Sequence, residues 1–332
     1  MKFRLGSILK AVSALLVIVF FVIYPDITPG RYWLSLAQQF FVFGLFAASL
    51  GLLMGYMGMN SLGHTVFFGL GAYITAIVSK RGVDPFAAAI CGLIGVIILG
   101  IIIGLSTAHM RGIIFMMVTV AFSQIFWGLS NQWYSLTGGD NGLAGVPRPV
   151  LAGVRLTGAN LYYLLMILFV VCIALLMWIV RTPLGLAIKG VKGSEARMRV
   201  LGYNVRLIKT LTVIISGFFA GVAGIMYVWF NSYVGTNELA VRTSAKGIVM
   251  VLVGGVGTIV GPLIGAVTLV IAEDYISSWS DRWVLFMGIL YIIVVLFMKG
   301  GIVGLVQKGF FAVKALITER TKQETPGIGP GN

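Results

Sequence analysis

A small polar group lies in the middle of a long stretch without charged side chains. Residues 32–79 contain no Lys, Arg, Asp or Glu, and Asn60, Ser61, His64 and Thr65 form the dense polar group within them. Polar side chains in lipid are costly unless they face a partner helix or water, so this group is predicted to point inward. An amide, a hydroxyl and an imidazole can bond a small polar solute, which makes Asn60, Ser61 and His64 candidate contacts on a translocation path. In an equally compatible structural role, Asn60 and Ser61 cap the next helix and His64 bonds to a neighbouring helix.

Glycine is abundant, with 44 copies, and it clusters in segments 55–64 and 254–262. Small residues let helix backbones approach closely, and they also let a helix unwind where a cavity satisfies the freed peptide groups. Close packing is the commoner role for any single glycine. Two clusters of this density nevertheless predict broken helices that line or hinge a translocation path. The glycines placed at these breaks are Gly58, Gly254, Gly255 and Gly257.

A basic segment, residues 181–209, separates two apolar stretches. Ser194 is expected to cap a short helix that runs to Leu201 and that Gly202 stops. Charged and apolar residues alternate along this helix so as to give one polar and one apolar face, as in a helix that docks on another molecule. A proline at Glu195 is expected to break it mid-helix. The alternative is a basic loop that only fixes the membrane topology or contacts anionic lipid.

Motifs for catalysis and for nucleotide or metal binding are absent from the sequence. It contains no G-x-x-x-x-G-K-[ST], H-E-x-x-H or G-x-S-x-G, and His64 and His109 are 45 positions apart. No catalytic residue, metal site or cofactor is therefore predicted, and any ATP hydrolysis must come from another chain. Cys91 and Cys172 lie in apolar runs and are expected to be small buried hydrophobic residues.

The composition of the chain predicts that membrane-spanning helices position the polar and glycine-rich segments described above. Of 332 residues, 59% are hydrophobic and 10% are charged, and the mean hydropathy is +1.01. So few charges cannot cover so much apolar surface in water, which indicates an all-α polytopic membrane protein. The net charge of +14 does not indicate nucleic acid binding, because long apolar stretches separate the basic residues.

About ten membrane-spanning helices are predicted. A span needs about 20 apolar residues, so 32–79 must hold two, and 237–276 is expected to form two short helices broken around 254–257. Ten spans place both termini and 16 of the 24 Lys and Arg residues in the cytoplasm, whereas nine spans divide these residues equally. The positive-inside rule therefore favours ten. The charge-free stretches are 11–25, 32–79, 85–110, 112–139, 156–180, 210–237, 247–272 and 283–298.

Four ordered motifs resemble the branched-chain amino acid ABC importer permeases of the LivM type (the LivH/LivM permease family). They are Asn60–His64 with Phe67–Tyr73, Thr137–Gly142, Thr182–Glu195 with Leu201–Asn204, and Val253–Pro262 with Gly265–Ala266. The resemblance runs from about residue 40 to Leu305 and implies a type II-like importer fold. A transmembrane permease domain is predicted over 1–305 and a cytoplasmic tail over 306–332. The tail is expected to be disordered beyond 319, because residues 321–332 are polar and have no apolar pattern to fold around.

The resemblance also implies partners in a bacterial plasma (inner) membrane: a LivH-like second permease subunit, two cytoplasmic ABC ATPase subunits and an extracytoplasmic solute-binding protein. An ATPase groove would receive residues 185–204, in which Val191–Glu195 keeps one acid where the family usually has more. The residues given this coupling role are Gly185, Lys189, Glu195, Ala196, Arg197, Leu201 and Gly202.

The predicted path offers hydroxyls, amides, an imidazole and backbone dipoles, because 32–79, 112–139 and 210–237 contain no charged side chain. Opposed helix ends can meet the two charges of a small zwitterion, whereas phosphate, polyamines or metal ions would need compensating charge at depth. With the resemblance, this predicts import of leucine, isoleucine or valine. Urea, short amides and other small neutral solutes are the alternative. An ion-coupled secondary transporter or channel is less favoured, and Glu273 and Asp274 would be its proton relay.

Overall fold

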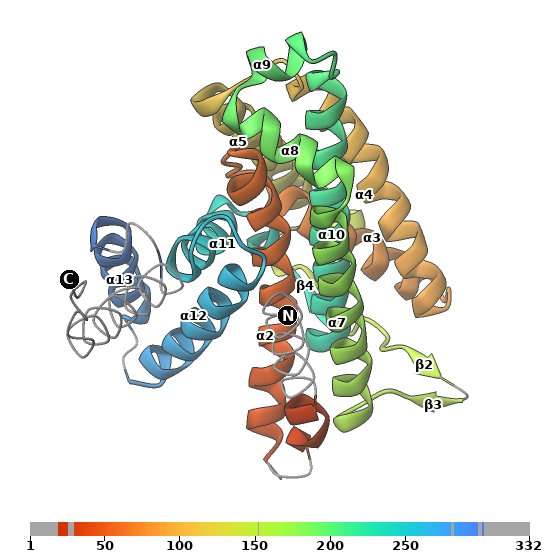
Figure 1. Cartoon of the computed structure of the whole chain (residues 1–332). Coiled ribbons are helices and arrows are strands. Elements are labelled where there is room, and N and C mark those ends of the chain that lie inside the picture. Colours follow the sequence, from red (N-terminus) through yellow and green to blue (C-terminus); the bar gives the residue numbers. More distant parts are fainter. Residues whose placement is uncertain (1–18, 26–29, 152, 280–281, 298–300, 302–332) are drawn as a thin grey trace, which may run out of the picture.

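The chain is a bundle of helices (Figure 1) in a computed structural model that describes residues 19–25, 30–151, 153–279, 282–297 and 301. Residues 19–25 are helical, and the rest of the charge-free stretch 11–25 and the 306–332 tail lie outside the described residues. The longer helices are α2 (Arg31–Gly51), continued by the π-helix η1 (Leu52–Met57), α3 (Thr65–Lys80), α4 (Pro85–Thr107), α5 (Gly112–Gln132), α7 (Ala159–Arg181), α8 (Pro183–Gly193), α10 (Val205–Asn231), α11 (Val241–Gly254), α12 (Val260–Trp279) and α13 (Trp283–Phe297). Shorter elements are α6 (Tyr134–Thr137), η2 (Gly139–Asn141), α9 (Glu195–Val200) and η3 (Thr236–Leu239).

Six described helices are long and apolar enough to cross a membrane, which confirms the all-α polytopic class. The helix Arg31–Met57 is the most buried of them and packs against α7, α10, α11 and α12. The number of ten spans stays a prediction. The six helices are Arg31–Met57, Pro85–Thr107, Gly112–Gln132, Ala159–Arg181, Val205–Asn231 and Val260–Trp279.

Both predicted breaks are present. The π-helix ends at Met57 and is followed by Gly58 with a φ of 76°, and α3 begins only at Thr65. The second break separates α11 from α12, with φ of 112° at Gly255 and 107° at Gly257. Left-handed and related backbone conformations carry a steric penalty for residues with a Cβ, which explains why glycine occupies these positions.

The basic segment is more helical than predicted. Ser194 caps α9 as expected, since its Oγ accepts from the Arg197 amide at 3.3 Å. The sequence reasoning missed α8, which begins with Pro183 at a position where proline is well tolerated. It also placed residues 205–209 in the loop, whereas the Asn204 side chain caps α10 by accepting from the Leu207 amide at 3.1 Å.

Two short antiparallel ribbons lie away from α8 and α9 (Figure 1). In one, β1 (Leu143–Ala144) pairs with β4 (Tyr233–Val234), and in the other β2 (Val150–Leu151) pairs with β3 (Val154–Arg155). Among the cysteines, Cys172 is buried as predicted, but Cys91 is exposed, because it lies on the outward apolar side of α4.

Candidate functional site

The two glycine-rich breaks meet each other. A Cβ added to Gly55 would lie 2.9 Å from the backbone nitrogen of Gly257, so the two segments touch through their backbones. Helix α8 reaches the same place, because Lys192 Nζ donates to the Gly55 carbonyl at 2.7 Å. The Lys192 stem also covers Gly58, whose added Cβ would be 3.0 Å from Cγ. The predicted path and the predicted coupling segment are therefore in direct contact.

The predicted polar contacts differ in exposure. Asn60 is exposed, whereas Ser61 is 2% exposed and His64 is fully buried. His64 Nε2 lies 2.9 Å from Ser49 Oγ on α2, so the expected bond to a neighbouring helix is confirmed. The prediction that Asn60 or Ser61 caps the next helix is wrong. That helix, α3, starts at Thr65 after His64, and no side chain caps it. Contact of these residues with a solute stays a prediction.

A buried hydroxyl network was missed by the sequence reasoning. Ser244 Oγ on α11 accepts from the Thr65 amide at 3.1 Å, and Thr65 Oγ1 lies 3.2 Å from Ser123 Oγ on α5. Ser123 also donates to the Leu239 carbonyl at 2.8 Å. These hydroxyls bond to each other and to the carbonyl of Leu239, the last residue of η3, which ties α3, α5 and α11 to η3. Isolated serines in apolar helices give no local signal of such a network.

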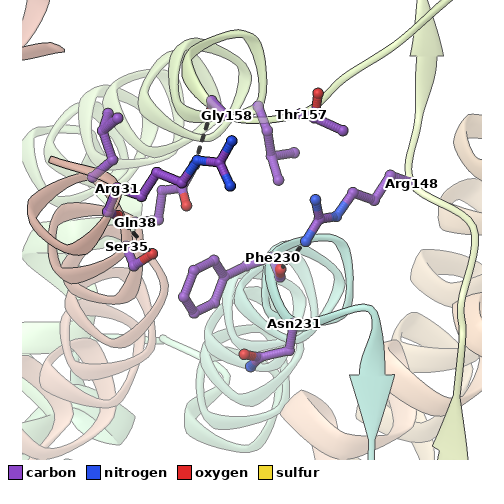
Figure 2. A pocket seen from close by; sticks show the side chains of 10 residues that line it. Arg31, Ser35, Gln38, Arg148, Thr157, Gly158, Phe230 and Asn231 are labelled. Atoms are coloured by element: carbon purple, nitrogen blue, oxygen red, sulfur yellow. Dashed lines mark hydrogen bonds between the residues drawn. The ribbon is translucent and has the colours of Figure 1, made fainter. Parts of the chain in front are cut away.

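A cavity of about 470 Å³ lies at another part of the bundle, between α2, α7 and α10 (Figure 2). Arg148 is held in its wall, with Nε donating to Ser232 Oγ at 3.0 Å and Nη2 to the Phe230 carbonyl at 3.1 Å. Arg31 and Gln38 also line it, whereas no acidic residue among those described does. The positive charge of Arg31 and Arg148 makes the cavity suitable for an anionic group. None of the predicted path residues lines the cavity.

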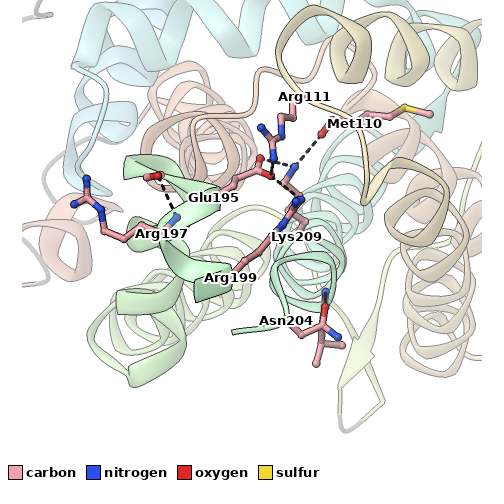
Figure 3. Close-up of polar contacts among 9 residues, drawn as sticks. Met110, Arg111, Glu195, Arg197, Arg199, Asn204 and Lys209 are labelled. Atoms are coloured by element: carbon pink, nitrogen blue, oxygen red, sulfur yellow. Dashed lines mark hydrogen bonds and ion pairs between the residues drawn. The ribbon is translucent and has the colours of Figure 1, made fainter. Parts of the chain in front are cut away.

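Glu195 is the centre of an ion-pair cluster (Figure 3). Its carboxylate lies 2.6 Å from Arg111 and 2.6 Å from Lys209, and Lys209 also donates to the Met110 carbonyl at 2.9 Å. Lys209 is 2% exposed and Glu195 is 14% exposed. The cluster joins α9 to the connection between α4 and α5 and to the start of α10.

This geometry corrects the role expected of Glu195. Glu195 is the first residue of α9, and the backbone amide at that position makes no hydrogen bond within the helix. A proline at Glu195 therefore does not break the helix in its middle, as the sequence predicted it would. Its carboxylate is engaged within the chain. A substitution at Glu195 therefore acts mainly by releasing α9 from Arg111 and Lys209.

The other predicted coupling residues fall into two groups. Ala196, Arg197, Leu201 and Gly202 are exposed on or just after α9, beside exposed apolar side chains such as Val200. Gly185 is instead buried, and a Cβ there would lie 2.3 Å from the Val180 carbonyl oxygen. Lys189 is exposed, and its Nζ lies 5.1 Å from the centre of the Tyr56 ring. The exposed group forms a surface, whereas Gly185 positions α8 against α7.

Gly202 has a φ of 83°, and nothing lies within 4 Å of a Cβ added to it. Valine there meets no neighbour but must adopt the left-handed backbone, which costs about 1–2 kcal/mol. For the importer complex that the resemblance implies, we expect Gly202→Val to lower uptake per ATP hydrolysed, whereas Gly202→Asn retains most of it, since asparagine tolerates this conformation. Unchanged uptake in the valine variant would mean that the segment only fixes topology.

The acidic pair proposed for a proton relay is engaged in contacts. Glu273 forms an ion pair with Lys246 of α11, and Asp274 accepts from the Tyr32 hydroxyl of α2. Helix α12 continues to Trp279, and Tyr32, which bonds to Asp274, is the second residue of α2. These contacts hold α12 against α11 and α2.

Residues 32–297 match the family described as "Branched-chain amino acid transport system / permease component". The chain belongs to this permease family. It is 24% identical over 323 residues to the high-affinity branched-chain amino acid transport system permease protein LivM of Escherichia coli K12, covering 90% of this chain and 76% of that protein. It is also 26% identical over 294 residues to the permease protein LivH of Salmonella typhimurium, covering 79% of this chain and 91% of LivH. No solved structure gives a significant match to this permease.

Proposed function

We propose that this permease is one of two different membrane subunits of an ATP-driven importer for leucine, isoleucine or valine. Relatives of two kinds, LivM and LivH, are both named as permease proteins of high-affinity branched-chain amino acid transport systems. The observation that carries the proposal is the contact between the glycine-rich breaks and α8, through Lys192 and the Gly55 carbonyl. Through this contact, α8, which is proposed to bind the ATPase, directly touches the glycine-rich breaks, which are proposed to border the path.

The energy source in this proposal is a pair of separate ATPase subunits that bind α8 and α9. The exposed side chains Arg197, Val200 and Leu201 form a mixed basic and apolar surface there. The positive-inside rule supports a cytoplasmic position for this end, because residues 181–209 hold seven of the 24 Lys and Arg residues. Both chain termini are then cytoplasmic, and a solute-binding protein delivers substrate at the extracytoplasmic side.

The path is proposed to run beside the two breaks. Asn60 is exposed while the adjacent Ser61 is buried, so the two positions make a matched pair. In a chain with Cys91 and Cys172 replaced by alanine, we expect Asn60→Cys to react with small thiol reagents and Ser61→Cys to react far more slowly. The measurement is the labelling rate in active vesicles, with and without ATP. An unreactive Asn60→Cys in protein that still transports would place the path elsewhere.

Substrate identity is tested by uptake competition in vesicles that contain the whole complex and its binding protein. Excess leucine, isoleucine or valine is expected to inhibit uptake, and urea or acetamide is expected not to. Inhibition by urea or acetamide alone would favour the small-amide alternative and would leave ATP-driven import standing.

The secondary-transporter alternative is tested with the chain alone. Uptake by the isolated chain that follows an ion gradient and ignores ATP would contradict the importer proposal. The ion pair and hydrogen bond that engage Glu273 and Asp274 favour a structural role for these carboxylates.

A further inference from the structure

The cavity between α2, α7 and α10 lies at the end of the bundle opposite to α8 and α9. Its lining includes the first residue of α2, the residues that precede α7 and the last residues of α10. Helix α8 follows the other end of α7, and α9 precedes the other end of α10. Neither the predicted path residues nor the predicted coupling residues line this cavity, so its side chains need a different explanation.

Exposed aromatic side chains mark the level of the cavity in the membrane. Tyr32 and Trp33, which directly follow Arg31, are 54% and 50% exposed. The ends of α12 and α5 lie on the same side, because Asp274 of α12 bonds to Tyr32 and β1, after α5, pairs with β4, after α10. The exposed aromatic residues at these two ends are Trp133, Tyr134, Tyr275 and Trp279. Tryptophan and tyrosine gather at the depth of the lipid headgroups, so the cavity lies at that depth.

Two arginines give the cavity a positive charge. Arg148 is held by its bonds to Ser232 and to the Phe230 carbonyl, whereas no described residue bonds to the Arg31 guanidinium. Figure 2 shows the two guanidinium groups turned toward the space between them. No acidic side chain is found among the lining residues that the structure describes. An anion placed between the two cations would therefore be strongly attracted and could accept hydrogen bonds from both.

Two long helices begin at this cavity without a capping side chain. Neither α2 nor α7 has a side-chain cap or an acidic residue in its first turn, and unpaired amides at a helix start favour anions. Gln38, two turns into α2, is 5% exposed and lines the same cavity. Its Nε2 donates to the Gly158 carbonyl at 3.4 Å, and its Oε1 bonds to no described residue. This oxygen is therefore available to accept from a hydroxyl group.

The cavity also has an apolar wall, formed by Leu34, Leu161 and Phe230. Its volume of about 470 Å³ lies within the range of about 300–1,000 Å³ that is typical of small-molecule sites. Helix α7 continues from the cavity with exposed apolar side chains, among them Ile167 and Val171. A cationic site beside an apolar wall, at headgroup depth, suits a molecule with an anionic head and an apolar tail.

We propose that this cavity binds the phosphate group of an anionic phospholipid with a glycerol headgroup. Arg31 and Arg148 bond to phosphate oxygens from two sides, and Gln38 accepts from a headgroup hydroxyl. A zwitterionic phospholipid fits less well, because its ammonium group would lie near two arginines with no acidic partner among the described lining residues. The lipid comes from the leaflet opposite to α8 and α9. Only the naming of this leaflet as extracytoplasmic rests on the proposed function.

The site is tested by native mass spectrometry of the full-length permease in detergent, titrated with phosphatidylglycerol or with phosphatidylethanolamine. We expect phosphatidylglycerol to bind more tightly, and Arg31→Gln and Arg148→Gln each to weaken its binding about tenfold, through loss of a charge-assisted hydrogen bond. Arg155→Gln is the matched control and should bind like the unchanged chain, because Arg155 is an exposed cation on β3 that does not line the cavity. Equal binding by Arg31→Gln and the unchanged chain would overturn the inference.

Folding and the source of the anion are separated by two further measurements. Arg148→Gln also removes bonds to Ser232 and Phe230, so the thermal midpoint of each variant without lipid is compared, and Arg31→Gln is expected to leave it unchanged. Millimolar leucine or inorganic phosphate is expected not to displace bound phosphatidylglycerol. Displacement by leucine would instead assign the cavity to the carboxylate of a transported solute, and displacement by inorganic phosphate would assign it to a soluble anion. Either result would overturn the lipid site.

Discussion

Replacing Lys209 by methionine is expected to destabilise the α9 end of the bundle and to uncouple ATP hydrolysis from uptake. Lys209 is 2% exposed and lies 2.6 Å from the Glu195 carboxylate, so the substitution leaves a largely buried carboxylate without its closest buried cation. The Met110 carbonyl loses its donor as well. Removing one partner of a buried ion pair typically costs about 3–5 kcal/mol, and we expect a smaller loss here because Arg111 still pairs with Glu195 at 2.6 Å. The measurements are the thermal midpoint of the purified complex and the uptake per ATP hydrolysed.

A second variant separates stability from coupling. In Lys209→Met with Glu195→Leu no buried charge is left unpaired, and the thermal midpoint is expected to recover toward that of the unchanged complex. Coupling is expected to stay impaired, because α9 has lost its attachment to Arg111. Arg206→Gln is the matched control, since Arg206 is an exposed cation on the same helix. A Lys209→Met complex with normal midpoint and normal coupling would contradict the assigned role of the cluster.

Replacing Gly254 by alanine is expected to prevent close packing of α11 on α12 and to abolish most transport. An added Cβ would lie 1.7 Å from the Gly261 carbonyl oxygen, and backbone atoms cannot move aside as a flexible side chain can. Overpacking in a well-packed core costs about 1–3 kcal/mol, and occasionally more. Gly265→Ala should behave similarly, because its Cβ would lie 1.8 Å from the Met250 carbonyl oxygen.

The control for this prediction is Gly288→Ala in α13, where nothing lies within 4 Å of the added Cβ. The amount of folded protein that survives detergent extraction and the uptake rate are both measured. If Gly254→Ala folds and transports normally, α11 and α12 do not pack as closely as described. If Gly254→Ala folds normally but loses transport, Gly254 acts as a hinge or a path residue, as its place in the glycine cluster predicted.

The sequence by itself determined the membrane class, the helical fold and the positions of both breaks. It also determined that Ser194 starts a helix and that Gly202 follows its end. These features depend on local physics: on apolar runs long enough to span lipid, on a side chain that caps a helix, and on glycines that adopt positive φ. Each of them can be read within a window of a few to about 20 residues.

Only the tertiary structure decided which of these residues meet. Gly55 contacts Gly257 across about 200 positions of sequence, and His64 is buried against Ser49 rather than exposed beside Asn60. Lys209, which charge patterning assigns to a loop, is buried in α10 with Glu195 as its partner. Burial and pairing depend on which helix faces pack together, and that choice is made by contacts between distant segments. No local pattern around His64 or Lys209 contains this information.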